Sequence, residues 1–157
     1  IAQCLVGSEM CIRDSPYSIE FPRAKVGNGA YDFSFSGLKS AVLNYLNGCK
    51  MKGIEVNTVD VAASFQQAVT DVLVGHAEHA IEQFKMDKFA IAGGVASNGV
   101  IRRAMEEMCN RKGVRFYHPS PILCTDNAVM IACAGYYGYL EKNFADMTLN
   151  AIPSLSL

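Results

Sequence analysis

Two stretches of the sequence carry residue types that could bind a ligand. The first, FAIAGGVASNGVIRRAM, breaks an apolar run at Gly93 and Gly94 and turns into a helical pattern near Asn98. Glycines let the backbone approach a ligand closely, and the first N–H groups of a helix attract an anion. The stretch predicts either an anion-binding turn in which Asn98 contacts the ligand, or only a tight turn with Asn98 as the helix cap. It is neither a Walker A loop nor a GxGxxG fingerprint.

The second stretch, CTDNAVMIACAG, places Asp126 and Asn127 at the start of a predicted helix. Thr125 or Asp126 could cap that helix with a side-chain oxygen. Alternatively, Asp126 could be a carboxylate ligand to a metal or lie near nucleotide phosphates. Junctions between a strand and a helix at the carboxyl edge of a parallel sheet gather such groups, so the pattern leaves both alternatives open.

Two other polar groups have weaker patterns. His76 and His79 are three residues apart in HAEH and could share a metal, but without HExxH or a third ligand they are better interpreted as helix-face histidines. A basic cluster, balanced by Glu106 and Glu107, indicates a solvated face with weak support for RNA contact. Its members are Arg102, Arg103, Arg111, Lys112 and Arg115. No GxSxG serine and no cysteine with a base partner occurs, so no catalytic residue is assigned.

Hydrophobic periodicity predicts the elements that position these residues. A helix should follow the extended stretch YDFSFSG and stop at Gly48. A long helix over 59–84, capped by Thr58 or Asp60, should come next and bury one apolar stripe: Val61, Phe65, Ala68, Val69, Val72 and Ala80. Next come a buried strand over 88–92, a helix over 98–112 ended by Gly113, a strand at VRFYHP and a helix over 126–140. In the last helix we expect these side chains to face inward: Val129, Cys133, Tyr136, Tyr137 and Leu140. The order predicts an α/β fold with a small, partly parallel sheet.

Composition indicates an ordinary globular protein. The chain has 157 residues, of which 50% are hydrophobic, enough for one domain with a core. Its formal net charge of -1, with scattered basic residues, gives no electrostatic signature of nucleic-acid binding. The six cysteines have no metal-like spacing and predict reduced thiols. The sequence shows no signal peptide and no apolar run long enough to cross a bilayer, so we expect no membrane association and a cytoplasmic location.

The first fifteen residues, IAQCLVGSEMCIRDS, have no clear period. The part from Leu5 to Ser15 resembles the translation of a transposase-type sequencing adapter, although a genuine loop or terminus is the alternative. We therefore expect residues 1–15 to be non-native and residues 16–157 to be the tail of a longer protein. The underlying nucleotide sequence would decide between the two interpretations.

Four motifs occur in order along the chain: FPRAKVGNGAYDFSFSGLKSA, VAASFQQAVTDVL, AIAGGVASNGVIRRAM and CTDNAVMIACAGYYGY. Together they resemble the C-terminal part of the TsaD (Gcp) family, the tRNA N6-adenosine threonylcarbamoyltransferases. The resemblance implies that residues 16–157 are part of the second lobe of an actin-like, sugar kinase and Hsp70-type ATPase fold. It also implies transfer of a threonylcarbamoyl group from threonylcarbamoyl-AMP to N6 of adenosine 37, in tRNAs that read codons beginning with A.

The resemblance implies roles for individual residues. Asn98 would contact the adenylate beside the turn formed by Gly93 and Gly94, and Asp126 would be a ligand of one divalent metal ion, iron or zinc. The family's other metal ligands are histidines of an HxxxH motif in the N-terminal half, which nothing in this sequence matches. We therefore expect His76 and His79 not to bind that metal and the chain alone to be inactive.

The same resemblance implies tRNA, other subunits of the t6A pathway and the missing N-terminal lobe of the chain as partners. Two alternatives remain: a small-molecule carbamoyltransferase of the same superfamily, and a non-catalytic nucleotide-binding or scaffold lobe. FSFSGLK together with GGVASN favours the tRNA-modifying family. The lack of HExxH gives no support to a metalloprotease.

Overall fold

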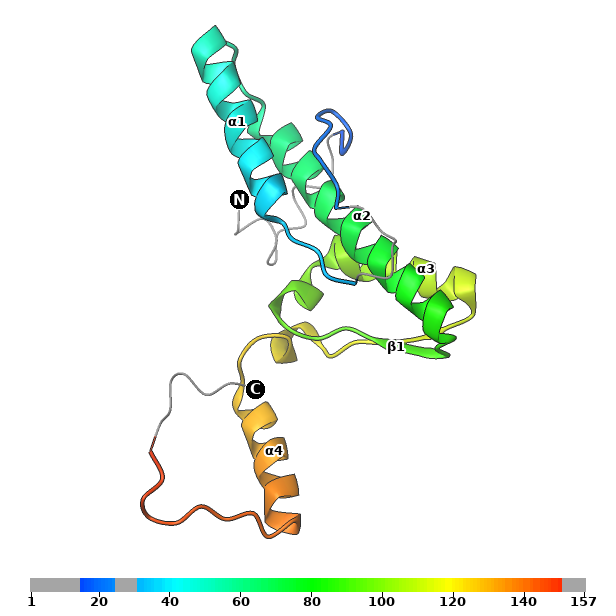
Figure 1. Ribbon diagram of the computed structural model, residues 1–157, viewed down its shortest axis with the longest axis vertical. Helices are drawn as coiled ribbons and strands as arrows, with labels where there is room; N and C mark the ends of the chain where they lie inside the picture. The colour runs from blue at the N-terminus through cyan, green and yellow to red at the C-terminus, as the bar shows by residue number, and fades with distance from the viewer. Residues whose placement is uncertain (1–14, 25–30, 151–157) are drawn as a thin grey trace. The chain divides into compact units, whose positions relative to one another are not determined.

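The computed structural model describes residues 15–24 and 31–150, so most of the predicted non-native segment, residues 1–14, lies outside the described residues. The elements in chain order are α1 (Ser36–Lys52), α2 (Thr58–Phe84), β1 (Lys88–Ala90), the 3₁₀ turn η3 (Gly94–Ser97), α3 (Gly99–Lys112), β2 (Arg115–Tyr117), the 3₁₀ turn η4 (Pro121–Leu123) and α4 (Ala128–Leu140) (Figure 1). The chain forms two compact units, and the boundary between them along the sequence falls between Cys124 and Thr125. Each unit is described by itself.

Helix α1 runs further than the sequence predicted. It passes through Gly48 and ends at Gly53, whose φ of 64° lies in the left-handed region that glycine adopts without strain. A glycine inside a helix costs only about 1 kcal/mol relative to alanine, so Gly48 weakens α1 without ending it. The prediction of a stop at Gly48 is therefore wrong.

Helix α2 is capped by Asn57, which precedes both predicted caps. The side-chain oxygen of Asn57 accepts hydrogen bonds from the backbone N–H groups of Val59 and Asp60, at 3.1 and 3.4 Å. A capping residue must itself have an extended backbone, as Asn57 does with ψ 99°, whereas Thr58 is already helical. The prediction of Thr58 or Asp60 as the cap is therefore wrong.

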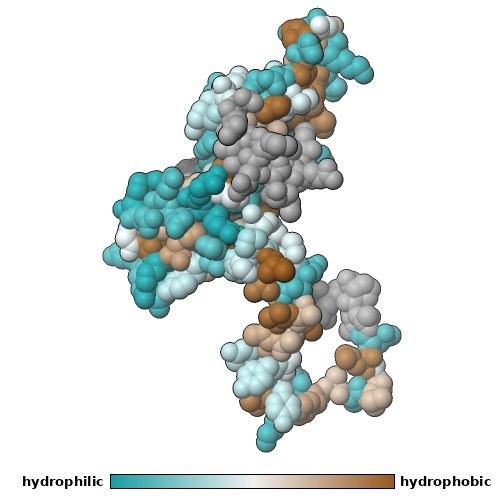
Figure 2. Space-filling view, turned by 180° about the vertical axis from the view of Figure 1, so that it is seen from behind, coloured by the Kyte–Doolittle hydropathy of each residue, from teal (hydrophilic) through white to brown (hydrophobic). Residues whose placement is uncertain are grey.

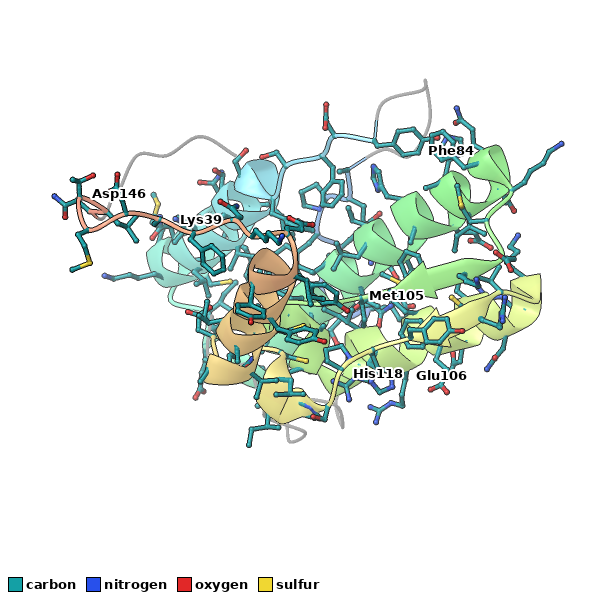
Figure 3. The ribbon with its side chains drawn as sticks, turned by 90° about the horizontal axis from the view of Figure 1, so that it is seen from below. Lys39, Phe84, Met105, Glu106, His118 and Asp146 are labelled. Atoms are coloured by element: carbon teal, nitrogen blue, oxygen red, sulfur yellow. The ribbon has the colours of Figure 1, made fainter. Side chains whose placement is uncertain are left out.

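The core of the first unit lies where α2 packs against α3, with α1 beside α2 (Figure 1). Of the six residues in the predicted stripe of α2, four are buried and two are half-buried. The buried ones are Val61, Ala68, Val69 and Val72, and the half-buried ones are Phe65 and Ala80. From α3 the buried side chains are Ile101, Met105, Met108 and Cys109. Figure 3 shows Met105 on the side of α3 that faces α2 and Glu106 on the opposite side. The space-filling view shows hydrophilic residues gathered over the outside of α3 (Figure 2).

Strands β1 and β2 pair in parallel, with Phe89 opposite Phe116, and α3 connects them. This confirms the predicted α/β character and parallel pairing in a helix-rich unit. The predicted burial of the first strand is wrong, because Lys88 and Ala90 are exposed and only Phe89 is half-buried. In a two-stranded sheet with α3 packed against β2, alternate side chains of the strands remain open to solvent.

Helix α4 belongs to the second unit and buries none of its side chains. Val129, Tyr136, Tyr137 and Leu140 are 55 to 60% exposed, and Cys133 is exposed as well. The prediction that these residues face inward is therefore wrong for this structure. Its sequence, AVMIACAGYYGYL, has no charged residue on any side of the helix, so it predicts burial without indicating which surface would cover the helix. Throughout the described ranges, no helix combines the length and apolarity needed to span a bilayer.

Candidate functional site

The stretch between β1 and α3 is an open turn built on Gly93. Its φ of 85° is a conformation that side-chain-bearing residues rarely adopt. Two backbone hydrogen bonds hold the turn: the N–H of Ala96 donates to the carbonyl of Gly93, and the N–H of Asn98 donates to the carbonyl of Val95, both at 3.0 Å. A Cβ atom at Gly93 or Gly94 would meet no heavy atom within 4 Å, so the space beside this backbone is free. The turn therefore leaves room for a ligand close to its backbone.

Asn98 caps α3, as one of the two sequence alternatives predicted. Its side-chain oxygen accepts hydrogen bonds from the N–H groups of Val100 and Ile101 at 3.0 and 3.1 Å. Its amide nitrogen donates to the side-chain oxygen of Gln66 at 3.3 Å, and the residue is 5% exposed. The cap fixes the orientation of this side chain beside the turn, while its contact with a ligand stays a prediction.

Gln66 is a site residue that the sequence did not single out. It lies on α2, is 5% exposed, and anchors Asn98 across a separation of 32 residues. The available signal was a polar residue within a buried helix face, where Ser64 and Thr70 are also buried. A buried polar side chain needs a partner, but the sequence does not reveal which partner the fold supplies.

Arg102 also departs from the sequence prediction. Its Nε and Nη2 atoms donate to the carbonyl oxygen of Ala96 at 3.2 and 2.8 Å, and Nη2 lies 3.9 Å from Sγ of Cys124. The side chain is half-buried against the turn, so its assignment to a solvated face is wrong. The other members of that cluster are exposed as predicted: Arg103, Arg111, Lys112 and Arg115.

Asp126 lies in the second unit, just before α4. The cap of α4 is neither Thr125 nor Asp126 but Asn127, whose side-chain oxygen accepts from the N–H of Met130 at 3.1 Å. The backbone of Asn127 is extended, with ψ 154°, which aims this oxygen at the first turn of α4. Asp126 is exposed and makes no hydrogen bond or ion pair with the described residues, so its carboxylate remains available to a metal.

The described residues form no complete metal site. They contain no group of three or more His, Cys, Asp or Glu side chains placed to hold one ion. Asp126 alone is a suitable hard ligand, and a complete site would need ligands from elsewhere.

The two histidines of HAEH are packed beneath aromatic rings. Nδ1 of His76 donates to the carbonyl of Val72 at 2.8 Å, and the ring of Phe33 lies 4.5 Å away, centroid to centroid. The ring of Tyr31 stacks on His79 at 5.7 Å. Both Nε2 atoms are buried without a hydrogen-bond partner. Among the described residues, these contacts agree with the interpretation as helix-face histidines rather than metal ligands.

Comparison with known proteins identifies relatives of this chain. Residues 4–133 match the family model described as "TsaD: tRNA N6-adenosine threonylcarbamoyltransferase". The match extends into residues 1–15, whose origin stays a prediction. The relative of that name from Desulfitobacterium hafniense (strain Y51) is 52% identical over 146 residues, which are 93% of this chain and 43% of the relative. The one from Clostridium beijerinckii is 53% identical over 140 residues, 89% of this chain and 41% of the relative. The chain therefore spans less than half the length of these relatives.

Proposed function

Because this chain belongs to the tRNA N6-adenosine threonylcarbamoyltransferase family, we propose that it is part of an enzyme that forms t6A in tRNA. The enzyme transfers a threonylcarbamoyl group from threonylcarbamoyl-AMP to N6 of adenosine 37, in tRNAs that read codons beginning with A. The observation that carries this proposal is identity of 52% over 93% of the chain to a relative of that name. The same relatives favour a tRNA acceptor over the small molecule of the alternative carbamoyltransferase.

We propose further that residues 16–157 form part of the second lobe of an actin-like, sugar kinase and Hsp70-type ATPase fold. The parallel pair of β1 and β2, joined through α3, supports this assignment. So does the site's position, because α/β sheets bind ligands where strands end and helices begin. The turn after β1 is such a junction.

In the proposed site, the backbone at Gly93 and Gly94 faces the adenylate. The open space at both glycines allows close approach, and the N-terminal end of α3 provides a positive dipole for the phosphate. Asn98, held by Gln66 and by the cap, contributes a side chain of fixed orientation. Such fixed geometry favours the bound acyl-adenylate because little ordering remains to be done on binding.

Asp126 would hold the divalent metal, iron or zinc, together with ligands from the part of the enzyme outside this chain. Its exposed carboxylate, which is not used in capping α4, supports this role. When bound, the metal supplies Lewis-acid polarisation of the reacting carbonyl and a fixed position for the acyl-adenylate. In the transfer, the N6 amine bonds to the carbamoyl carbon and loses a proton. The bond between that carbon and the phosphate oxygen breaks, and AMP leaves with the electron pair.

The proposed partners are tRNA, other subunits of the t6A pathway and the preceding lobe of the same protein, in the cytoplasm. The formal net charge of -1 gives this chain little attraction for phosphate backbones. Most of the tRNA-binding surface should therefore be provided by the preceding lobe or by partner subunits.

The proposal is tested by measuring t6A in tRNA after reaction with the full-length protein that carries this sequence. We expect the unchanged protein to form t6A and Asp126→Asn to lower the rate about 100-fold, because a metal ligand is lost. Asp146→Asn changes an exposed acid of the same unit and should leave the rate unchanged. No t6A with the unchanged protein would overturn the proposed function, and equal rates for both variants would overturn the role of Asp126.

A further inference from the structure

Three parts of the first unit meet at the guanidinium group of Arg102. The side chain starts from the first turn of α3 and reaches back to the carbonyl oxygen of Ala96 in η3, which accepts from both Nε and Nη2. Nη2 also lies 3.9 Å from Sγ of Cys124, the residue that follows η4. Ala96 and Cys124 are each 4% exposed, so the half-buried Arg102 side chain contacts two buried residues.

We propose that Arg102 is a positioning residue that fixes the adenylate-facing turn relative to Cys124, the last residue of the first unit. Cys124 is itself held at η4, because its N–H donates to the carbonyl of Pro121 at 3.1 Å, so Arg102 ties the turn to a second fixed part of the same unit. The inference rests on the proposed function, since the turn takes its role from it. It adds to that function a residue which contacts neither substrate nor metal.

The turn needs such an anchor because its own hydrogen bonds are few. Turn η3 spans four residues, and short 3₁₀ turns have poorer hydrogen-bond geometry than α-helices. The carbonyl of Ala96 lies near the end of this turn, where carbonyl groups lack partners from the turn itself. Arg102 supplies two donors to that buried oxygen and thereby ties the turn to α3.

The contact depends on the shape of the arginine head group. A guanidinium presents several N–H donors in one plane, so Nε and Nη2 can both donate to Ala96 while Nη2 also faces Cys124. A lysine ammonium is a single point of charge and cannot hold both positions in the same way. The neighbouring Arg103 has the same chemistry but is exposed, which makes it a matched control.

The first test measures backbone hydrogen exchange in the full-length protein. Arg102→Gln should accelerate exchange at the N–H groups of Ala96 and Asn98, and also at Cys124, whose N–H donates to Pro121. Arg103→Gln should leave these sites unchanged. Unchanged exchange in Arg102→Gln, or acceleration in the turn alone, would overturn the bridge that we propose. This test is decisive whether or not the protein forms t6A.

The second test is kinetic and uses the same full-length variants. Arg102→Gln should raise KM for threonylcarbamoyl-AMP about tenfold with an unchanged KM for tRNA, and Arg102→Lys should restore part of the difference. A loss of folded protein would instead lower kcat and leave both KM values unchanged, and that result would contradict the positioning role. Absence of t6A with the unchanged protein would refute the proposed function, and hydrogen exchange would then decide by itself whether Arg102 bridges the two segments.

Discussion

At Asn98, a single side chain closes the N-terminus of α3 and joins that helix to α2 through Gln66. The proposed contact with the adenylate would be a third role for the same residue. These roles can be separated by experiment, because α2 has a cap of the same chemistry at Asn57, outside the proposed site.

Asn98→Ala should destabilise the protein by about 1 to 2 kcal/mol, since the cap and the contact with Gln66 are both lost. Asn57→Ala removes an exposed cap and should cost about 1 kcal/mol. Urea unfolding measures both changes. Only Asn98→Ala should also weaken binding of threonylcarbamoyl-AMP to the full-length protein. Equal binding by the two variants would show that Asn98 has a capping role alone.

The sequence predicts the local roles of single residues better than their distant contacts. The cap at Asn98 and the end of α3 at Gly113, with φ 68°, follow from short-range rules and are confirmed. The contacts of Arg102 with Cys124 and of Asn98 with Gln66 join residues 22 and 32 positions apart. No spacing rule predicts such contacts, because they depend on how the helices pack.

At the scale of elements, the packing of α2 against α3 supports the turn that precedes α3. Met108 is the largest fully buried side chain among the described residues and belongs to the core of the first unit. The periodicity of both helices predicts this packing, whereas the exact length of α1 and the exposure of β1 depend on weaker local signals.

Met108→Ala should lower the free energy of unfolding by about 2 to 5 kcal/mol, because it leaves a cavity between the helices. Met51→Ala offers a control on α1, where the side chain is 88% exposed and the change should stay within about 0.5 kcal/mol. Denaturant unfolding, followed by circular dichroism, measures the free energy of unfolding of both variants. If Met108→Ala lowers this free energy no more than Met51→Ala does, the packing described for α2 and α3 is contradicted.

The same two helices are joined at their surface by Lys112, which pairs with Glu82 and lies 3.0 Å from Glu78. The hydrogen bond from Lys112, and then its positive charge, hold the pKa of Glu82 below its ordinary value. A lowered folded-state pKa stabilises the protein above the ordinary carboxyl range, and this stabilisation is lost as the pH falls through the folded-state pKa. The pair is solvent-exposed, so its contribution should be small.

We therefore expect Glu82→Gln to reduce stability slightly at neutral pH and to have no effect in acid, at pH values below the folded-state pKa of Glu82. Thermal unfolding at a series of pH values measures this difference. Glu106→Gln, on the exposed side of α3, is the control for the loss of one surface carboxylate. An effect of Glu82→Gln that stays constant down to low pH would disprove the contribution of this ion pair.

At the scale of the whole molecule, the sequence predicted the α/β class and the family, but it did not predict the exposure of α4. Apolar residues indicate that a helix becomes buried, and the covering surface need not lie in the same stretch of chain. The chain covers 43% of the Desulfitobacterium hafniense relative. The proposed metal site has the same character, since Asp126 would be one ligand and the described residues offer no complete set.

The central claim is that this chain supplies one part of a t6A-forming site. The most direct measurement is mass spectrometry of tRNA nucleosides after incubation with threonylcarbamoyl-AMP and either the full-length protein or this chain alone. We predict t6A at adenosine 37 with the full-length protein, supplied with its partner subunits, and none with the chain alone. Formation of t6A by the chain alone, or transfer by the full-length protein only to small molecules, would contradict that claim.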